Sequence, residues 1–211
     1  MSIYLDSAII AEARVAQEWG WVKGITTNPN LLGKTDLPVE LTLKGLASLT
    51  TGPIFYQLVS SDFEEMLAEG KQAFEMIGSQ TVLKIPASLV GFKALACLME
   101  NITCAVTSIY SPSQALVAGE AGAKYAITYV DRTTRLMGDG IALVTDMASI
   151  LAGSQTEIMA ASIKSPTQAI ASLRAGARHL TLPLGIIQSL TNHELSLQTI
   201  DEFASNGKGI I

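Results

Sequence analysis

Eight short apolar segments, each followed by an amphipathic one, are the feature that most limits the fold of this chain. The apolar segments predict strands at residues 3–6, 24–27, 54–58, 81–85, 104–108, 125–130, 157–162 and 179–182. The stretches between them have the alanine, leucine, glutamate and lysine content of helices. Strands that alternate with helices predict a parallel sheet, since each helix returns the chain to the edge where the next strand begins.

Two α/β architectures share this alternation. Eight strand–helix units in 211 residues favour a closed (β/α)8 TIM barrel at the small end of the known range. An open doubly wound sheet is the alternative, but no GxGxxG motif follows a strand and the sequence has no P-loop. We therefore predict a single-domain α/β barrel that spans residues 1–211.

Several predicted helices begin and end with recognisable signals. Ser111 and Ser165 each offer a capping hydroxyl before a proline at the first helical position. The pair Ser61-Asp62 precedes two glutamates, which the helix dipole favours in a first turn. Gly122 and Gly176, each flanked by alanines, predict helix ends.

Composition argues against several classes of protein. An apolar fraction of 48% with 16% charged residues is typical of a packed chain rather than a disordered one. The net charge of −5 and the scattered lysines and arginines argue against a nucleic-acid partner. No uncharged apolar run reaches the roughly 18 residues of a membrane span, and the N-terminus does not resemble a signal peptide. We expect a cytoplasmic protein with no membrane partner.

The cysteines and histidines do not indicate a metal. Cys97 and Cys104 lack CxxC spacing, which fits the thiols of a reduced cytosolic protein. His179 and His193 lie on separate predicted elements with no ligand spacing. We therefore expect no metal among the site residues.

Lys84 lies near the end of a segment that otherwise has the pattern of a buried strand. Burial disfavours the ammonium form and lowers the pKa of a lysine, and a neutral amine can condense with a ketone or aldehyde. The ordinary alternative is a strand-end lysine whose amine reaches solvent.

Polar side chains at the other strand ends favour the catalytic interpretation of Lys84. The carboxyl ends of barrel strands converge on one mouth, where active sites lie. The residues expected there are Asp6, Thr26, Asn28, Gln57, Lys84, Thr107, Tyr129, Arg132, Ser162 and Lys164. Each has an ordinary explanation as a cap, a solvated strand end or a core hydroxyl. Together they would surround one lysine with groups suited to imine chemistry at a sugar carbonyl, while the eighth strand would supply only wall.

Some of these residue types predict particular roles. The carboxylate of Asp6 can shuttle protons while a carbinolamine forms and loses water. The amide and hydroxyl groups of Thr26, Asn28 and Ser162 can orient the hydroxyls of a polyol.

A phenol at the strand end predicts a bound water. The hydroxyl of Tyr129, together with Gln57 and Thr107, can hold the water that moves a proton when a carbon–carbon bond opens.

Residues 131–140 are expected to form the longest strand-to-helix loop, with two arginines and two glycines. Next to it in the barrel, the helix start at Ser165 would present free backbone N–H groups, which bind anions. Arg132 and that helix start therefore predict a site for a substrate phosphate, and Lys164 is a further candidate for substrate binding. The alternative is a solvated surface loop with balanced charges.

Five blocks of this sequence resemble the transaldolase family. Residues 4–8 (Tyr-Leu-Asp-Ser-Ala) and 24–32 (Gly-Ile-Thr-Thr-Asn-Pro-Asn-Leu-Leu) are similar to its N-terminal signature. Residues 82–86 (Val-Leu-Lys-Ile-Pro) resemble the strand that carries its Schiff-base lysine, and residues 129–132 and 160–164 are similar to two later blocks. The blocks occur in order over nearly the whole chain. The length resembles the small subfamily, which includes the fructose-6-phosphate aldolases.

The resemblance implies a mechanism. Lys84 would form an imine with C2 of a ketose phosphate, and cleavage between C3 and C4 would release glyceraldehyde 3-phosphate and leave a dihydroxyacetone enamine. An aldolase protonates and hydrolyses that enamine, whereas a transaldolase transfers it to an aldose phosphate. No metal or organic cofactor is expected, because in this family the iminium itself accepts the electrons.

Two positions favour the aldolase over the transaldolase. Transaldolases of the family typically have glutamate on the third strand and phenylalanine on the sixth, where this chain has Gln57 and Tyr129, as in the fructose-6-phosphate aldolases. A neutral amide cannot act as a base, so a phenol-bound water would take over the proton. Two residues depart from the family pattern: Asn30 replaces a common serine, and Asp131 replaces glycine or asparagine. The charge of Asp131 could weaken phosphate binding.

Two other kinds of protein remain as alternatives. A barrel that only binds sugar phosphates would keep Arg132 but would not need Lys84, Asp6 and Tyr129 together. A scaffold protein would need repeats or a large apolar surface, which the sequence lacks. Because small transaldolase-like proteins resemble ring-forming assemblies, we expect a homo-oligomer, with the predicted helix at residues 195–204 as a contact.

Overall fold

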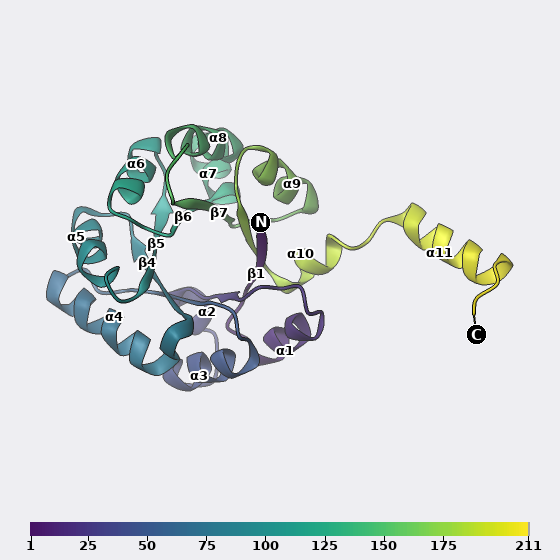
Figure 1. Cartoon of the computed structure of the whole chain (residues 1–211), viewed down its shortest axis with the longest axis horizontal. Helices are drawn as coiled ribbons and strands as arrows, with labels where there is room; N and C mark the ends of the chain where they lie inside the picture. Colours follow the sequence, from purple (N-terminus) through teal and green to yellow (C-terminus); the bar gives the residue numbers. More distant parts are fainter. Residues whose placement is uncertain (211) are drawn as a thin grey trace.

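The eight predicted strands close into a parallel barrel. In the computed structural model, which describes residues 1–210, the strands follow chain order around the barrel (Figure 1). They are β1 (Ser2–Asp6), β2 (Ile25–Thr26), β3 (Ile54–Gln57), β4 (Thr81–Pro86), β5 (Thr103–Ile109), β6 (Tyr125–Tyr129), β7 (Glu157–Ala161) and β8 (His179–Leu182). Because β8 pairs with β1, the prediction of a (β/α)8 barrel is confirmed and the open sheet is wrong.

Helices surround the barrel and connect its strands. They are α1 (Ile10–Glu18), α2 (Pro29–Leu32), α3 (Val39–Leu49), α4 (Phe63–Ile77), α5 (Leu89–Leu98), α6 (Pro112–Glu120), α7 (Val130–Met137), α8 (Gly140–Ile150), α9 (Pro166–Arg174), α10 (Leu184–Ser189) and α11 (Glu194–Asn206), with a 3₁₀ turn, η1 (Gly78–Gln80), after α4. Two helices follow β6, whereas β5 and β7 are each followed by one.

The predicted helix signals are confirmed. The hydroxyls of Ser111 and Ser165 accept hydrogen bonds from backbone N–H groups in the first turns of α6 and α9. Asp62 caps α4 in the same way. Gly122 and Gly176 follow α6 and α9 with φ angles of 80° and 112°, a left-handed conformation that glycine adopts without steric cost.

The prediction of a long loop at residues 131–140 is wrong, because most of this segment is the helix α7. Asp131 and Arg135, four residues apart, form an ion pair of 3.1 Å on its surface. The two glycines of the predicted loop lie instead where one helix ends and the next begins. Gly138, with a φ angle of 99°, ends α7, and Asp139 caps α8, which begins at Gly140.

The core has two layers. The larger one lies between the strands and the helices and includes fully buried residues such as Leu46 and Leu95. The smaller one fills the interior of the barrel, where Tyr4, Phe55 and Tyr125 meet with ring centroids 5.2–5.3 Å apart. These rings occupy the lower and middle part of the barrel, so the space for polar side chains lies above them, where the strands end.

The last helix, α11, stands apart from the barrel (Figure 1). None of its residues is buried, and its apolar side chains Leu195, Ile200 and Phe203 are each 60–69% exposed. The helix predicted at residues 195–204 is therefore present, but it covers no surface of its own barrel.

Candidate active site

Lys84 is buried at the inner face of β4, with 4% of its surface exposed. Its Nζ atom donates a hydrogen bond of 2.7 Å to the backbone carbonyl of Thr27, which follows β2. Burial lowers the pKa of Lys84 to about 8, although the carboxylate of Asp6 raises it in part. At pH 7 roughly a tenth of such an amine is neutral and able to attack a carbonyl carbon.

Asp6 contributes a carboxylate to the barrel mouth, on the side opposite β5. Asp6 ends β1, and its neighbour in the parallel register is Thr26 on β2, whose hydroxyl donates a 2.9 Å hydrogen bond to Asp6 Oδ1. Burial raises the pKa of Asp6 above its ordinary value, while Lys84, the Thr26 hydroxyl and Lys164 each lower it in part. A carboxyl group with a raised pKa exchanges protons more readily near neutral pH than a solvated one.

On the other side of Lys84, β5 and β6 contribute hydroxyl groups. The hydroxyls of Tyr129 and Thr107 are hydrogen-bonded at 2.8 Å, and the Ser108 hydroxyl donates a longer bond of 3.4 Å to Tyr129. Ser108 has a φ angle of 61°, which is unusual for a residue with a side chain, and the β5–β6 register shifts there. The irregular backbone turns Ser108 toward the mouth.

Gln57 lies beside Lys84, because the two residues are paired in the register of β3 and β4. Its Oε1 atom is buried and has no hydrogen-bond partner within residues 1–210. A buried carbonyl oxygen without a partner is rare in a folded protein, and at a cavity it is a natural acceptor for a water or substrate hydroxyl.

These side chains line one cavity of about 410 Å³ at the carboxyl ends of the strands. Its walls are formed by Asp6, Thr26, Asn28, Pro29, Asn30, Leu31, Gln57, Lys84, Ser108, Ile127, Tyr129, Arg132, Ala161, Ser162, Lys164 and Thr181. Every site residue predicted from the sequence lines this cavity except Thr107. That residue is fully buried and reaches the cavity only through its bond to Tyr129.

The rim of the cavity is cationic. The guanidinium of Arg132, on the first turn of α7, lies 5.1 Å from the ring centroid of Tyr129. Lys164 is exposed on the neighbouring segment, which follows β7, just before the start of α9. The carboxylate of Asp131 bonds to Arg135, which directs its charge toward that arginine.

Asn28 has a structural contact as well as a place in the wall. Its side-chain oxygen accepts a 3.0 Å hydrogen bond from the backbone N–H of Leu31 and caps α2. The cap holds the Asn28 side chain at the cavity, so the structural explanation and the substrate-binding one are compatible at this residue.

Sequence reasoning missed three polar residues of the wall, which are Asn30, Ser108 and Thr181. Thr181, on β8, lines the cavity and is hydrogen-bonded to the hydroxyl of Thr26, so the expectation that the eighth strand supplies only wall is wrong. Side chains alternate along a strand, and His179 and Thr181 share the inner face, so this period could have identified Thr181. Ser108 gave no such signal, because its orientation depends on the irregular backbone.

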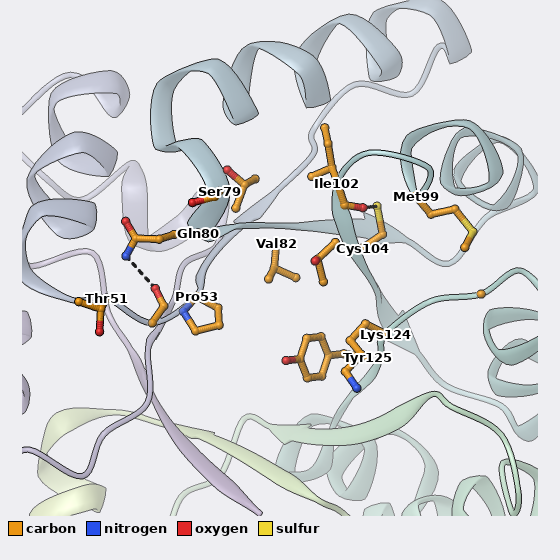
Figure 2. A pocket seen from close by; sticks show the side chains of 14 residues that line it. Thr51, Pro53, Ser79, Gln80, Val82, Met99, Ile102, Cys104, Lys124 and Tyr125 are labelled. Atoms are coloured by element: carbon orange, nitrogen blue, oxygen red, sulfur yellow. Dashed lines mark hydrogen bonds between the residues drawn. The ribbon is translucent and has the colours of Figure 1, made fainter.

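A second cavity, of about 480 Å³, opens at the other end of the barrel (Figure 2). The side-chain amide of Gln80 donates hydrogen bonds to the carbonyls of Thr50 and Gly52, and the Cys104 thiol donates one to the carbonyl of Ile102. Burial raises the pKa of Cys104 to about 12, so its thiol is a poor nucleophile at neutral pH. Size alone therefore does not identify the reactive end of the barrel.

Within residues 1–210, no group of three or more histidine, cysteine, aspartate or glutamate side chains has the arrangement of a metal site. None of the helices in this part of the chain is long and apolar enough to cross a membrane.

Comparison with solved structures finds a similar fold in an enzyme of low sequence identity. Mandelate oxidase, solved with benzoyl-formic acid, superposes with a TM-score of 0.62 at 14% sequence identity. The match covers 83% of this chain but only 59% of the oxidase chain. At this level of identity the likeness concerns the fold alone.

Sequence comparison finds much nearer relatives. A probable transaldolase of Hydrogenobaculum sp. is 39% identical over 206 residues, which cover 96% of this chain and 94% of the relative. A probable transaldolase of Aquifex aeolicus is 36% identical over the same coverage. The model of the family described as transaldolase/fructose-6-phosphate aldolase matches residues 3–208. The chain therefore belongs to this family and is one of its enzymes.

Proposed function

We propose that this enzyme is a class I aldolase that cleaves fructose 6-phosphate to dihydroxyacetone and glyceraldehyde 3-phosphate, or forms it from them, through an imine at Lys84. The observation that carries the proposal is the buried amine of Lys84, with its lowered pKa, in a cavity lined by polar side chains. Its imine would also serve a transaldolase, so the choice between the two reactions rests on the groups around it.

The first steps convert the ketone into an electron acceptor. The neutral amine of Lys84 attacks C2 of the ketose, and the carbinolamine loses water to give a protonated imine. The C3–C4 bond then breaks, and its electron pair moves toward C2 to form an enamine. The proton of the C4 hydroxyl passes to Asp6, whose raised pKa suits it to accept this proton, and C4 leaves as the aldehyde.

The last steps release the remaining fragment. The enamine takes a proton at C3, and water adds to the imine carbon to give dihydroxyacetone and the free amine of Lys84. A water between Gln57 Oε1 and the hydroxyl of Tyr129 is suited to these steps, because the amide oxygen lacks a partner and the phenol is held by Thr107.

The phosphate of the substrate is proposed to bind at the rim. Arg132 and Lys164 offer two positive charges, and the first turn of α9 offers backbone N–H groups beyond the Ser165 cap. Ser162, which is also in the cavity wall, has a φ angle of 57° and lies between the reacting centre and this cationic rim. Its hydroxyl, with that of Thr26 and the amide of Asn28, is proposed to orient the sugar hydroxyls.

A transaldolase is the second candidate, because the curated relatives are named probable transaldolases. The aldolase is favoured by Gln57, since a neutral amide does not take the proton of the water bound by Tyr129, and that proton remains available to the enamine. The two candidates differ only in whether water or an aldose phosphate consumes the enamine.

Two measurements test the proposal. Borohydride reduction with fructose 6-phosphate should add a covalent fragment to Lys84, visible in the intact mass; the absence of an adduct would favour a barrel that only binds sugar phosphates. Cleavage of fructose 6-phosphate should then proceed without an acceptor. Activity that appears only when erythrose 4-phosphate is added would show a transaldolase instead.

We also propose that the chain self-associates through α11. The helix projects from its own barrel and exposes Leu195, Ile200 and Phe203, and the occupant of this face is proposed to be a second copy of the chain. Light scattering should give a mass that is a multiple of 22.3 kDa. Phe203→Asp should reduce that mass, and an unchanged monomer in both proteins would contradict the proposal.

A further inference from the structure

Glu69, outside the catalytic cavity, holds the segment that carries Gln57. This glutamate lies on α4, and its carboxylate accepts hydrogen bonds from the Tyr56 hydroxyl at 2.8 Å and from the backbone N–H of Ser60 at 3.0 Å. The backbone N–H of Val59 lies 3.0 and 3.1 Å from its two oxygens. One side chain thus binds three donors between residues 56 and 60.

Gln57 lies between these anchored groups. Side chains alternate along β3, so Phe55 and Gln57 face the barrel interior while Tyr56 faces α4. Glu69 therefore holds Tyr56, the residue before Gln57, from the outer side of the strand. It also holds the backbone of Val59 and Ser60, two and three residues after Gln57. The N–H of Leu58 donates to the carbonyl of Lys84 at 3.0 Å, which ties the same segment to the lysine strand.

We propose that Glu69 is a positioning residue that fixes the orientation of Gln57 beside Lys84 and thereby controls the steps in which water consumes the enamine and imine. The expected kinetic effects rest on the proposed imine mechanism. The placement of Gln57 by Glu69 does not depend on that mechanism. The amide oxygen of Gln57 has no partner of its own in residues 1–210, so its orientation depends on the backbone that Glu69 holds.

A carboxylate is the side chain that this arrangement requires. It offers two acceptor oxygens to three donors, whereas a glutamine would turn an NH₂ group toward one or more of the same donors. Burial raises the pKa of Tyr56, and the hydrogen bond to Glu69 raises it further, so the phenol remains a donor throughout the neutral range. Truncation of Tyr56 to phenylalanine would remove one of the bonds and leave the backbone ones in place.

Three variants test the inference against a matched control. Glu69→Gln should lower kcat for cleavage of fructose 6-phosphate about tenfold, because small displacements of a group that acts on the reacting atoms have effects of this size or larger. Tyr56→Phe should have a smaller effect in the same direction. Glu75→Gln, an exposed position on the same helix, removes the same charge and should leave kcat unchanged.

Two readouts separate positioning from a general loss of structure. If only the water-dependent steps slow, KM should not rise, and the fraction of Lys84 trapped by borohydride during turnover should increase in Glu69→Gln. Independently of catalysis, the NMR signal of the Gln57 side-chain amide, identified by its loss in Gln57→Ala, should shift in Glu69→Gln and not in Glu75→Gln.

Some results would overturn the inference. An unshifted Gln57 amide signal in Glu69→Gln would do so whatever the reaction proves to be. If the wild type forms the Lys84 adduct but Glu69→Gln and Glu75→Gln have equal kcat values, the inference is also refuted, while the imine mechanism stays intact. A wild type that forms no adduct would instead refute the proposed function, and the amide signal would still decide whether Glu69 positions Gln57.

Discussion

The two ends of this barrel hold cavities of similar size but different chemistry. One cavity at the strand starts is about 480 Å³, and the cavity at the strand ends is about 410 Å³. At the starts, Gln80 and Cys104 bond to backbone carbonyls, and Lys124 pairs with Glu157 at 3.3 Å. At the ends, the amine of Lys84 is buried beside a carboxylate that does not fully offset its desolvation, and the amide oxygen of Gln57 has no partner among the described residues.

The difference teaches that reactivity depends on which groups line a cavity rather than on its volume. A buried polar group whose partners are all provided by the protein stabilises the fold and has nothing left to offer a ligand. A buried group that lacks a partner costs stability, and a substrate or water can recover that cost. The following predictions test whether the two ends differ in this way.

The largest effect is expected at Lys84. Lys84→Met removes the nucleophile and should lower kcat about 10⁴-fold or more, with no adduct after borohydride reduction. Residual turnover near the wild-type rate would mean that the strand ends react without this amine.

The pH dependence of adduct formation is the next largest effect. Only the neutral amine attacks, and the pKa of Lys84 is lowered to about 8. The rate of single-turnover trapping should therefore rise about tenfold per pH unit below pH 8 and level off above it. A rate that still increases steeply between pH 9 and 10 would indicate a solvated lysine with an ordinary pKa.

Gln57→Glu should change the products more than the overall rate. A carboxylate competes with the enamine for the proton of the bound water, whereas an amide does not, so hydrolysis should slow and the ratio of transfer to cleavage in the presence of erythrose 4-phosphate should rise about tenfold. Chromatography of the sugar phosphates measures this ratio. If the ratio is the same in both proteins, Gln57 does not determine the fate of the enamine.

The smallest effect on catalysis is expected at the other end of the barrel. Cys104→Ala should lower the free energy of unfolding by about 1–2 kcal/mol through lost packing and leave kcat unchanged. Denaturant unfolding and the cleavage assay measure the two quantities. A large fall in kcat would show that the two ends are coupled and would contradict their separation into structural and reactive regions.

The sequence predicted the barrel because its signals are local and repeated. Each strand is a short apolar run, and the caps at Ser111 and Ser165 depend only on nearby residues. The strand ends could be predicted for the same reason, since barrel closure brings Asp6, Lys84 and Tyr129 to one mouth.

Features that depend on neighbouring chain segments were harder to predict. The segment 131–140 has glycines and charges typical of a loop, but the Asp131–Arg135 pair and packing against the barrel make most of it helical. Glu69 has no signal in the sequence at all, because its three donors lie 9 to 13 residues earlier along the chain. Its importance appears only when α4 packs against β3.

The two serines with positive φ angles, Ser108 and Ser162, limit how the mouth of this barrel can be redesigned. Both side chains line the cavity, so they are obvious positions for altering the range of substrates. Glycine, asparagine and aspartate tolerate this backbone conformation, whereas valine, isoleucine and threonine are strained in it by roughly 1–2 kcal/mol. A saturation library at either position should thus be depleted of β-branched residues among its folded members, whichever substrate is used for selection.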